Sequence, residues 1–233
     1  MKIKIFLDGA NFDEMLAHYR GDFPVSGYTT NPTLMRKAGV TDYEAFARKV
    51  LAAIPDRPIS FEIFSDELPE MERQALTIAS WGKNVYVKIP VTTTKGVSTA
   101  PIISRLSQQG IKLNITAVFT PQQVQTITEA LAVKTPSIIS VFAGRIANAG
   151  VDPMPIMKTA VAIANIRPAC EILWASTREA FNCLQAEACR CHIITVPSDI
   201  LKVVKTFGKD LEQYSRETVQ VFHDDAQKAG YTL

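Results

Sequence analysis

Short runs rich in β-branched and aromatic residues recur along the whole chain at a nearly regular interval. Each run has the length of a strand and is dominated by Ile, Val, Phe and Thr. The first run begins at Ile3 and the eighth at His192, so the mean spacing is about 27 residues, enough for one strand, one helix and two short loops. The eight runs are residues 3–8, 27–31, 59–64, 85–90, 112–119, 137–144, 171–176 and 192–197. This interval predicts eight repeated strand–helix units.

The segments between the runs carry helix signals. Thr120 followed by Pro121, and Asp152 followed by Pro153, have the pattern of an N-cap and a first-turn proline. Eight strand–helix units predict an α/β fold: a single (β/α)8 TIM barrel domain over residues 1–233, with an extra C-terminal helix within residues 208–230. A doubly wound open sheet is the alternative. It normally has fewer strands, and the chain lacks G-x-G-x-x-G and G-x-x-x-x-G-K-[ST] motifs.

Charge and hydropathy narrow the classes of partner. The net charge of +2 comes from 25 basic and 23 acidic side chains, which is too even for a nucleic-acid or anionic membrane surface. No apolar run reaches the length of a membrane span, and the first run meets Asp8 too early for a signal peptide. We therefore expect a cytoplasmic protein that binds small molecules.

The four cysteines all lie in the last third of the chain, at positions 170, 183, 189 and 191. With none earlier in the chain to bridge to, reduced thiols are expected. Cys189, Cys191 and His192 form a short cluster, but they lack the spacing of a zinc site and a second pair of ligands. We expect no bound metal.

Alternation along the predicted strands places polar groups on one face near the strands' C-terminal ends. Successive side chains of a strand point to opposite sides, and in a barrel the inward C-terminal end forms the active site. By this alternation the inward residues are Asp8, Glu62, Lys88, Asn114, Thr116, Ser140 and Phe142, and Leu173 is assigned outward so that Ser176 points inward. Any one charge would fit a frayed strand end or a buried ion pair. A lysine and two carboxylates together favour a functional site, because each unpaired buried charge costs several kcal/mol.

These residue types suggest carbonyl chemistry. Desolvation of Lys88 between Val87 and Ile89 should disfavour its ammonium form, and a neutral amine adds to ketones and aldehydes to give a Schiff base. Asp8 and Glu62 could then move protons. Arg145 and Arg178, each just beyond a predicted strand, would suit a phosphate group.

The stretches that carry these residues resemble the transaldolases, in particular the small transaldolase and fructose-6-phosphate aldolase-like branch. Beside Asp8, they are residues 28–34 (YTTNPTL), 85–96 (VYVKIPVTTTKG), 110–124 (GIKLNITAVFTPQQV), 140–146 (SVFAGRI) and 174–178 (WASTR). The resemblance implies a (β/α)8 barrel that acts on sugar phosphates through a Schiff base, without metal or cofactor. It implies that Lys88 forms the Schiff base, that Asp8 is the general acid and base, and that Glu62 and Thr116 hold the catalytic water. It also implies that the dihydroxyacetone unit is held by Asn31, Asn114 and Ser140, and the sugar phosphate by Arg145, Ser176 and Arg178.

Two activities compete within that family, and two positions separate them. By the resemblance, transaldolases carry Glu and Phe where the fructose-6-phosphate aldolases carry Gln and Tyr; this chain has Glu62 and Phe142. We therefore expect transaldolase activity in the pentose phosphate pathway. The alternatives are an aldolase that releases dihydroxyacetone, a non-catalytic sugar-phosphate-binding barrel, and a pyridoxal phosphate enzyme, for which no glycine-rich phosphate cup is present.

The segment after the eighth run carries a strong apolar stripe at helical spacing. The stripe consists of Leu211, Tyr214, Thr218, Val221, Phe222 and Ala226. It could pack on its own barrel. In the family that the chain resembles, this helix reaches a neighbouring subunit in ring-like decamers, so the resemblance implies a homo-oligomer.

Overall fold

The computed structural model describes residues 1–21, 23 and 25–232. Eight parallel strands form a closed barrel in the order of the sequence, with β8 pairing back to β1. The strands are β1 Lys4–Asp8, β2 Gly27–Thr29, β3 Ile59–Glu62, β4 Val85–Pro90, β5 Leu113–Val118, β6 Ser137–Val141, β7 Cys170–Trp174 and β8 Ile193–Val196. The predicted (β/α)8 barrel is confirmed. An open sheet is ruled out, because four residue pairs join β1 to β8.

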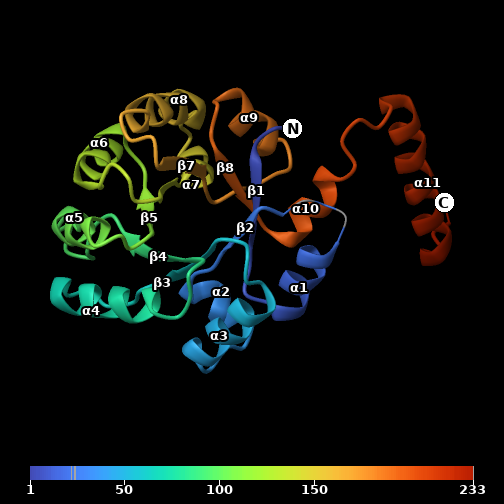
Figure 1. The fold of residues 1–233 in the computed structure, drawn as a ribbon. Helices are drawn as coiled ribbons and strands as arrows, with labels where there is room; N and C mark the ends of the chain where they lie inside the picture. Colours follow the sequence, from blue (N-terminus) through green and yellow to red (C-terminus); the bar gives the residue numbers. More distant parts are fainter. Residues whose placement is uncertain (22, 24, 233) are drawn as a thin grey trace.

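Helices surround the barrel, and most strands are followed by one (Figure 1). They are α1 Phe12–Arg20, α2 Pro32–Lys37, α3 Tyr43–Ala53, α4 Leu68–Ala79, α5 Ala100–Gln108, α6 Pro121–Ala130, α7 Ala143–Asn148, α8 Pro153–Ala164, α9 Asn182–Ala188, α10 Ser198–Val204 and α11 Leu211–Ala229. Both predicted N-caps are confirmed. Thr120 forms a capping box with Gln123, and the Asp152 side chain accepts from the Met154 amide.

The apolar core has two parts, which strand alternation separates. The larger part lies between the strands and the helices; Ile5, Leu7, Val87 and Ile89 belong to it. A smaller cluster fills the barrel interior and consists of Phe6, Ile138, Leu173, Ala175 and Ile193. Phe6 has the same parity as Asp8 in β1, and Ile138 has the same parity as Ser140 in β6. The face predicted to carry the site is therefore the barrel interior.

Leu173 is the one residue whose face was predicted wrongly. It belongs to the inner cluster, whereas Trp174 packs in the outer core. The prediction relied on Ser176, which lies beyond the end of β7, where strand alternation no longer applies; Glu171, inside the strand, has the same parity as Leu173. Ser176 reaches the interior from beyond the strand by a left-handed backbone with φ of 63°.

Close packing fills the bottom of the barrel. Gly27 pairs with Phe6, and a Cβ at Gly27 would lie 2.5 Å from the Phe6 ring, so this position requires glycine. Lys4 and Glu171 form a 2.7 Å ion pair below it, and the Ile172 amide donates to His192 Nδ1. The open end of the barrel is therefore the opposite one, at the C-terminal ends of the strands.

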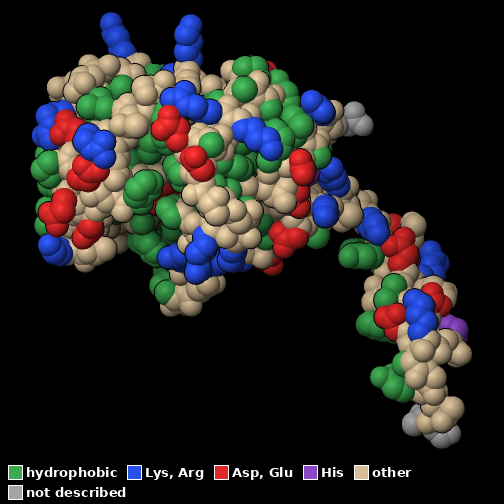
Figure 2. Space-filling view, turned by 90° about the horizontal axis from the view of Figure 1, so that it is seen from below, with side chains coloured by type: hydrophobic (Ala, Val, Ile, Leu, Met, Phe, Trp, Pro, Cys, Tyr) green, Lys and Arg blue, Asp and Glu red, His purple; other side chains and the backbone are tan. Residues whose placement is uncertain are grey.

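The C-terminal helix α11 stands apart from the barrel as an arm (Figures 1 and 2). All of α11 lies in the described part of the chain, and none of its residues is buried. Leu211 and Phe222 on the apolar stripe are 80% and 68% exposed. The stripe does not pack on its own barrel.

Three further findings concern the thiols, possible metal ligands and possible membrane spans. All four cysteines are free and buried, and burial raises the pKa of Cys170 to about 12 and that of Cys183 to about 11. Across the described residues, no group of three His, Cys, Asp or Glu side chains could hold a metal ion. None of the helices described has both the length and the apolar character needed to cross a membrane.

Candidate active site

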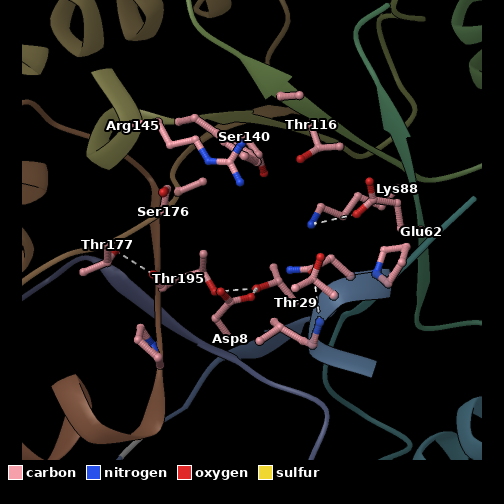
Figure 3. Close-up of a pocket in the computed structure, with 18 of the residues that line it drawn as sticks. Asp8, Thr29, Glu62, Lys88, Thr116, Ser140, Arg145, Ser176, Thr177 and Thr195 are labelled. Atoms are coloured by element: carbon pink, nitrogen blue, oxygen red, sulfur yellow. Dashed lines mark hydrogen bonds and ion pairs between the residues drawn. The ribbon is translucent and has the colours of Figure 1, made fainter. Parts of the chain in front are cut away.

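A cavity of about 650 Å³ opens at the C-terminal ends of the strands (Figure 3). All eight strands, or the segments that follow them, contribute residues to its wall. The lining includes these predicted site residues: Asp8, Asn31, Glu62, Lys88, Thr116, Ser140, Phe142, Arg145, Ser176 and Arg178. Ten of the eleven predicted site residues therefore meet around one cavity.

The lysine of β4 is paired with the carboxylate that ends β3. Glu62 and Lys88 are register partners in the two strands, and Lys88 Nζ lies 3.2 Å from Glu62 Oε2. The Lys88 ammonium also donates to the Thr30 carbonyl at 3.0 Å. The side chains of the ion pair are mostly buried: 7% of the Lys88 side chain and 15% of the Glu62 side chain are exposed. The amine is thus held by two oxygen partners at the edge of the cavity.

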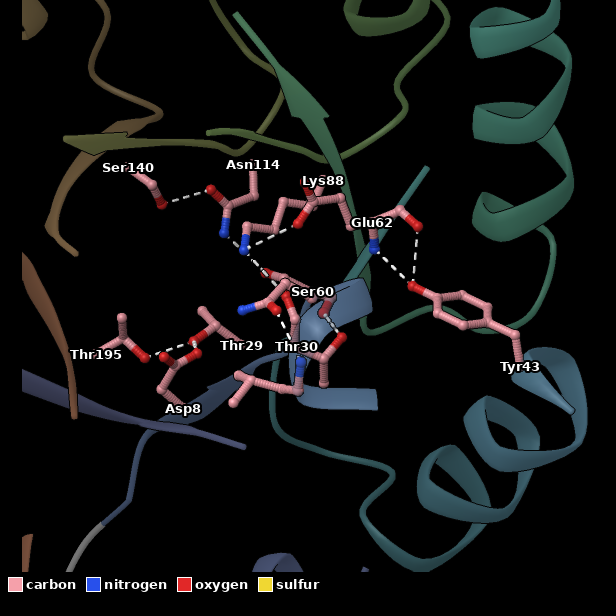
Figure 4. A network of polar contacts seen from close by, with 12 residues as sticks. Asp8, Thr29, Thr30, Tyr43, Ser60, Glu62, Lys88, Asn114, Ser140 and Thr195 are labelled. Carbon is pink, nitrogen blue, oxygen red and sulfur yellow. Dashed lines mark hydrogen bonds and ion pairs between the residues drawn. The ribbon is translucent and has the colours of Figure 1, made fainter. Parts of the chain in front are cut away.

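Asp8 faces this pair from β1. Thr29 Oγ1 donates to Asp8 Oδ1 at 2.8 Å, and the Thr29 hydroxyl is itself hydrogen-bonded to that of Thr195 (Figure 4). Burial raises the pKa of Asp8, whereas the charge of Lys88 and the Thr29 hydrogen bond act in the opposite direction. A carboxyl group with a raised pKa is suited to both taking and returning a proton.

Asn114 is the predicted site residue that lies beneath the cavity instead of on its wall. It is fully buried, its amide donates to Ser60 Oγ at 2.9 Å, and its Oδ1 accepts from Ser140 Oγ at 2.7 Å. Thr116, two residues further along β5, lines the cavity; among the described residues its buried Oγ1 has no hydrogen-bond partner. That hydroxyl is available to a water molecule or a ligand.

Two arginines and a serine lie together at the mouth of the cavity. Arg145 stands on α7, and Ser176 and Arg178 follow β7. In the amide orientation that satisfies both of its polar atoms, Asn148 accepts from Arg178 Nη2 at 3.2 Å and donates to the Gly144 carbonyl at 3.1 Å. The paired guanidinium groups provide the charge and planar donors that a phosphate group needs.

Sequence reasoning missed several residues of the wall. Thr29 and Thr195 complete the surroundings of Asp8, and Lys37 adds a fourth cation to the lining, beside Lys88 and the two arginines. Alternation along β2 and β8 could have found Thr29 and Thr195, since each has the inward parity of its strand. Lys37 is on a helix, and no strand pattern points to it.

A closed eight-stranded barrel with an amine, two carboxylates and two arginines around a cavity at the C-terminal ends of its strands has the architecture of the (β/α)8-barrel enzymes, whose active sites lie at that end. A family model described as "Transaldolase/Fructose-6-phosphate aldolase" matches residues 5–233. The chain belongs to the transaldolase/fructose-6-phosphate aldolase family.

Known relatives agree with that membership. A "Probable transaldolase" of Dehalococcoides mccartyi is 37% identical over 200 residues, which are 85% of this chain and 88% of the relative. Another, of a Thermoanaerobacter species, is 36% identical over 234 residues and covers 99% of this chain and 100% of its own length. The chain is thus similar to aldolase/transaldolase enzymes over nearly its whole length.

A solved structure supports the fold alone. A putative dihydrodipicolinate synthase family protein from Coccidioides immitis superposes with a TM-score of 0.58 at 14% identity. The match covers 83% of this chain and 66% of that chain.

Proposed function

We propose that the protein is a transaldolase that moves a dihydroxyacetone unit from a ketose phosphate to an aldose phosphate. The donors are fructose 6-phosphate or sedoheptulose 7-phosphate, and the acceptors erythrose 4-phosphate or glyceraldehyde 3-phosphate, as in the pentose phosphate pathway. The observation that carries the proposal is the Lys88–Glu62 pair facing Asp8 across one cavity with two arginines at its mouth.

The proposed reaction begins at Lys88. One proton of its ammonium group passes to Glu62, 3.2 Å away, and the neutral amine adds to the C2 carbonyl of the ketose phosphate. Glu62 returns the proton to the carbinolamine hydroxyl, which leaves as water and gives a protonated imine. The Asp8 carboxylate takes the proton of the C4 hydroxyl, the C3–C4 bond breaks, and its electron pair moves toward the imine to leave an enamine. The shortened aldose phosphate then departs.

Transfer completes the cycle. The enamine carbon attacks the aldehyde carbon of the acceptor, and Asp8 returns its proton to the new hydroxyl. Water then adds to the imine and releases the new ketose phosphate from Lys88. Glu62, 3.2 Å from the amine, and the Thr116 hydroxyl are placed to hold this water.

The binding roles in the proposal are those that the family resemblance implies, and the lining of the cavity supports them. In the proposal, Arg145, Ser176 and Arg178 bind the sugar phosphate. The dihydroxyacetone unit is bound by Asn31 and Ser140, with Asn114 reaching it through its hydrogen bond to Ser140.

Transfer is favoured over cleavage by one aromatic side chain. Phe142 lines the cavity, and its ring packs against Phe119 with centroids 5.8 Å apart. Without a hydroxyl, Phe142 cannot activate water to release dihydroxyacetone, so the enamine waits for an aldehyde. We expect turnover of fructose 6-phosphate only when erythrose 4-phosphate is added. Free dihydroxyacetone formed from fructose 6-phosphate alone would identify an aldolase instead.

The non-catalytic alternative is tested by trapping. Borohydride reduction in the presence of fructose 6-phosphate should leave a mass adduct on Lys88. A protein that binds fructose 6-phosphate without an adduct would be a sugar-phosphate-binding barrel.

We also propose that the protein is a homo-oligomer in which α11 packs on a second copy. The support is the exposed apolar stripe of α11, which is costly to leave in water. Light scattering coupled to size exclusion measures the copy number, for which the family resemblance suggests ten.

A further inference from the structure

The hydrogen-bond ladder between β2 and β3 stops one step before the residues of the site. The Thr30 amide donates to the Ser60 carbonyl at 3.1 Å, which is an ordinary step of a parallel ladder. The next step would join the Glu62 amide to the Thr30 carbonyl, and the one after it would join the Glu62 carbonyl to residue 32. Residue 32 is a proline without an N–H, and the chain turns there into α2.

A tyrosine side chain makes the hydrogen bonds that β2 would have made had it continued. Tyr43, the first residue of α3, donates its hydroxyl proton to the Glu62 carbonyl at 2.9 Å. The same hydroxyl oxygen accepts from the Glu62 amide at 2.8 Å (Figure 4). One phenol therefore satisfies both backbone groups of Glu62 that β2 leaves unpaired, which a hydroxyl can do because it both donates and accepts.

The bonding of Tyr43 to the Glu62 backbone also affects Lys88. Since the Glu62 amide bonds to Tyr43, the Thr30 carbonyl is left for another donor, and it accepts from Lys88 Nζ at 3.0 Å. Tyr43 thus fixes the backbone of Glu62 and leaves the Thr30 carbonyl oxygen free to accept from Lys88.

Three aromatic side chains pack around Tyr43. Its ring packs edge-on against Phe61 and Phe64, with centroids 6.3 and 5.7 Å away, and lies 5.9 Å from Trp81. Burial raises the pKa of Tyr43 well above its usual range, so the hydroxyl keeps the proton that it donates. On α4, Gln74 Oε1 accepts from the Phe64 and Ser65 amides and anchors the chain just after Glu62.

We propose that Tyr43, backed by Gln74, is a positioning residue for the Lys88–Glu62 pair. Its hydroxyl replaces the two backbone hydrogen bonds that β2 no longer makes with Glu62. It thereby sets where the Glu62 carboxylate and the Thr30 carbonyl meet the Lys88 amine. The inference rests on the proposed Schiff-base function and adds to it a residue outside the cavity.

The test compares Tyr43→Phe with wild type and with Tyr28→Phe. Tyr28 is a buried tyrosine of β2 whose hydroxyl also donates to a backbone carbonyl; that carbonyl belongs to Met15 on α1, so the Tyr28 hydroxyl forms no bond with Glu62. Removing the Tyr43 hydroxyl lets the Glu62 amide return to the Thr30 carbonyl and displaces the pair. We expect kcat and the rate of borohydride trapping at Lys88 to fall together by about tenfold, because small displacements of reacting groups are costly.

Two further readings separate positioning from a structural role. KM should stay within about twofold of wild type, since Arg145 and Arg178 are untouched. Tyr28→Phe should lower the melting temperature to a similar extent without changing kcat. A Tyr43→Phe protein with wild-type kcat and trapping rate would overturn the inference, and so would an equal loss of kcat in Tyr28→Phe.

Two other outcomes are possible: the wild type fails to form the adduct, or Tyr43→Phe fails to fold. If the wild type itself gives no adduct at Lys88, the proposed function fails, and the inference with it. If Tyr43→Phe does not fold, Gln74→Met replaces it, because that half-buried side chain holds the two residues after Glu62. A Gln74→Met enzyme with unchanged kcat and trapping rate would then count against the inference.

Discussion

Lys88 is the residue on which the proposed chemistry depends, and the first prediction concerns it. Lys88→Met keeps most of the side-chain volume but removes the amine, so turnover and borohydride trapping should both be lost. The matched control is Lys112→Met, since Lys112 precedes β5 at the end of the barrel opposite the cavity, where its Nζ donates to the Lys83 carbonyl. Mass spectrometry after reduction is the measurement. Activity retained by Lys88→Met would refute the assignment.

A second residue-scale prediction concerns the pH dependence of Asp8. Its pKa is raised by burial and lowered again by the Lys88 charge and the Thr29 hydrogen bond. Asp8 acts first as a base, so kcat should fall as the pH falls through its pKa in the folded enzyme. Thr29→Val removes a donor that favours the charged form, so the pKa rises further and the acidic limb moves to higher pH.

The control for that change is Thr135→Val, which removes a threonine hydroxyl bonded to the Ser107 carbonyl, away from the cavity. Profiles of kcat against pH for the three proteins give the comparison. An acidic limb that stays in place or moves to lower pH in Thr29→Val would contradict the role given to Asp8.

At the scale of elements, helix α7 and the loop after β7 meet in a contact that admits only glycine. A Cβ at Gly144 would lie 1.7 Å from the Ser176 carbonyl oxygen. Gly144→Ala should therefore push the loop away and destabilise the fold by about 2–4 kcal/mol, measured by denaturant unfolding. Gly9→Ala is the control, because a Cβ there meets nothing within 4 Å. Equal unfolding free energies for the two variants would show that the loop is not constrained.

The same two elements carry the phosphate-binding prediction. Arg178 accompanies Arg145 at the mouth and is hydrogen-bonded to Asn148 of α7. Arg178→Ala should raise KM for fructose 6-phosphate about tenfold or more, because a charge-assisted hydrogen bond contributes about 1.5–3 kcal/mol. The effect on kcat should be smaller. The control is Arg190→Ala, because Arg190 is exposed and follows α9. An unchanged KM for fructose 6-phosphate in Arg178→Ala would mean that the phosphate binds elsewhere.

For the whole molecule, the prediction concerns assembly. Phe222 is 68% exposed on the apolar stripe of α11, and Phe222→Glu should dissociate the proposed oligomer while the barrel stays folded. Gln220→Glu adds the same charge on the opposite side of the helix and should leave assembly intact. Light scattering reports the mass, and circular dichroism reports the fold. Wild-type protein that is already monomeric would contradict the proposal.

Most of the barrel could be predicted from sequence because strand–helix alternation is a local pattern. Thr120 with Pro121 and Asp152 with Pro153 begin helices where expected, since capping acts within one turn. The predicted faces were also correct for strands with one polar parity, such as the one that ends at Glu62. Prediction failed at Leu173 because its face was inferred from Ser176, which lies past the end of β7 in a left-handed backbone, where strand alternation no longer applies.

The sequence by itself determined the number of strand–helix units and, through parity, that Asp8, Glu62, Lys88, Thr116 and Ser140 face the cavity, because these follow from spacing and alternation along the chain. Tertiary structure alone decided what those side chains meet. The 3.2 Å approach of Lys88 to Glu62 and the place that Tyr43 takes at the end of β2 depend on strand register and on where a strand stops. Such features arise from contacts between residues distant in the chain, which no local pattern encodes.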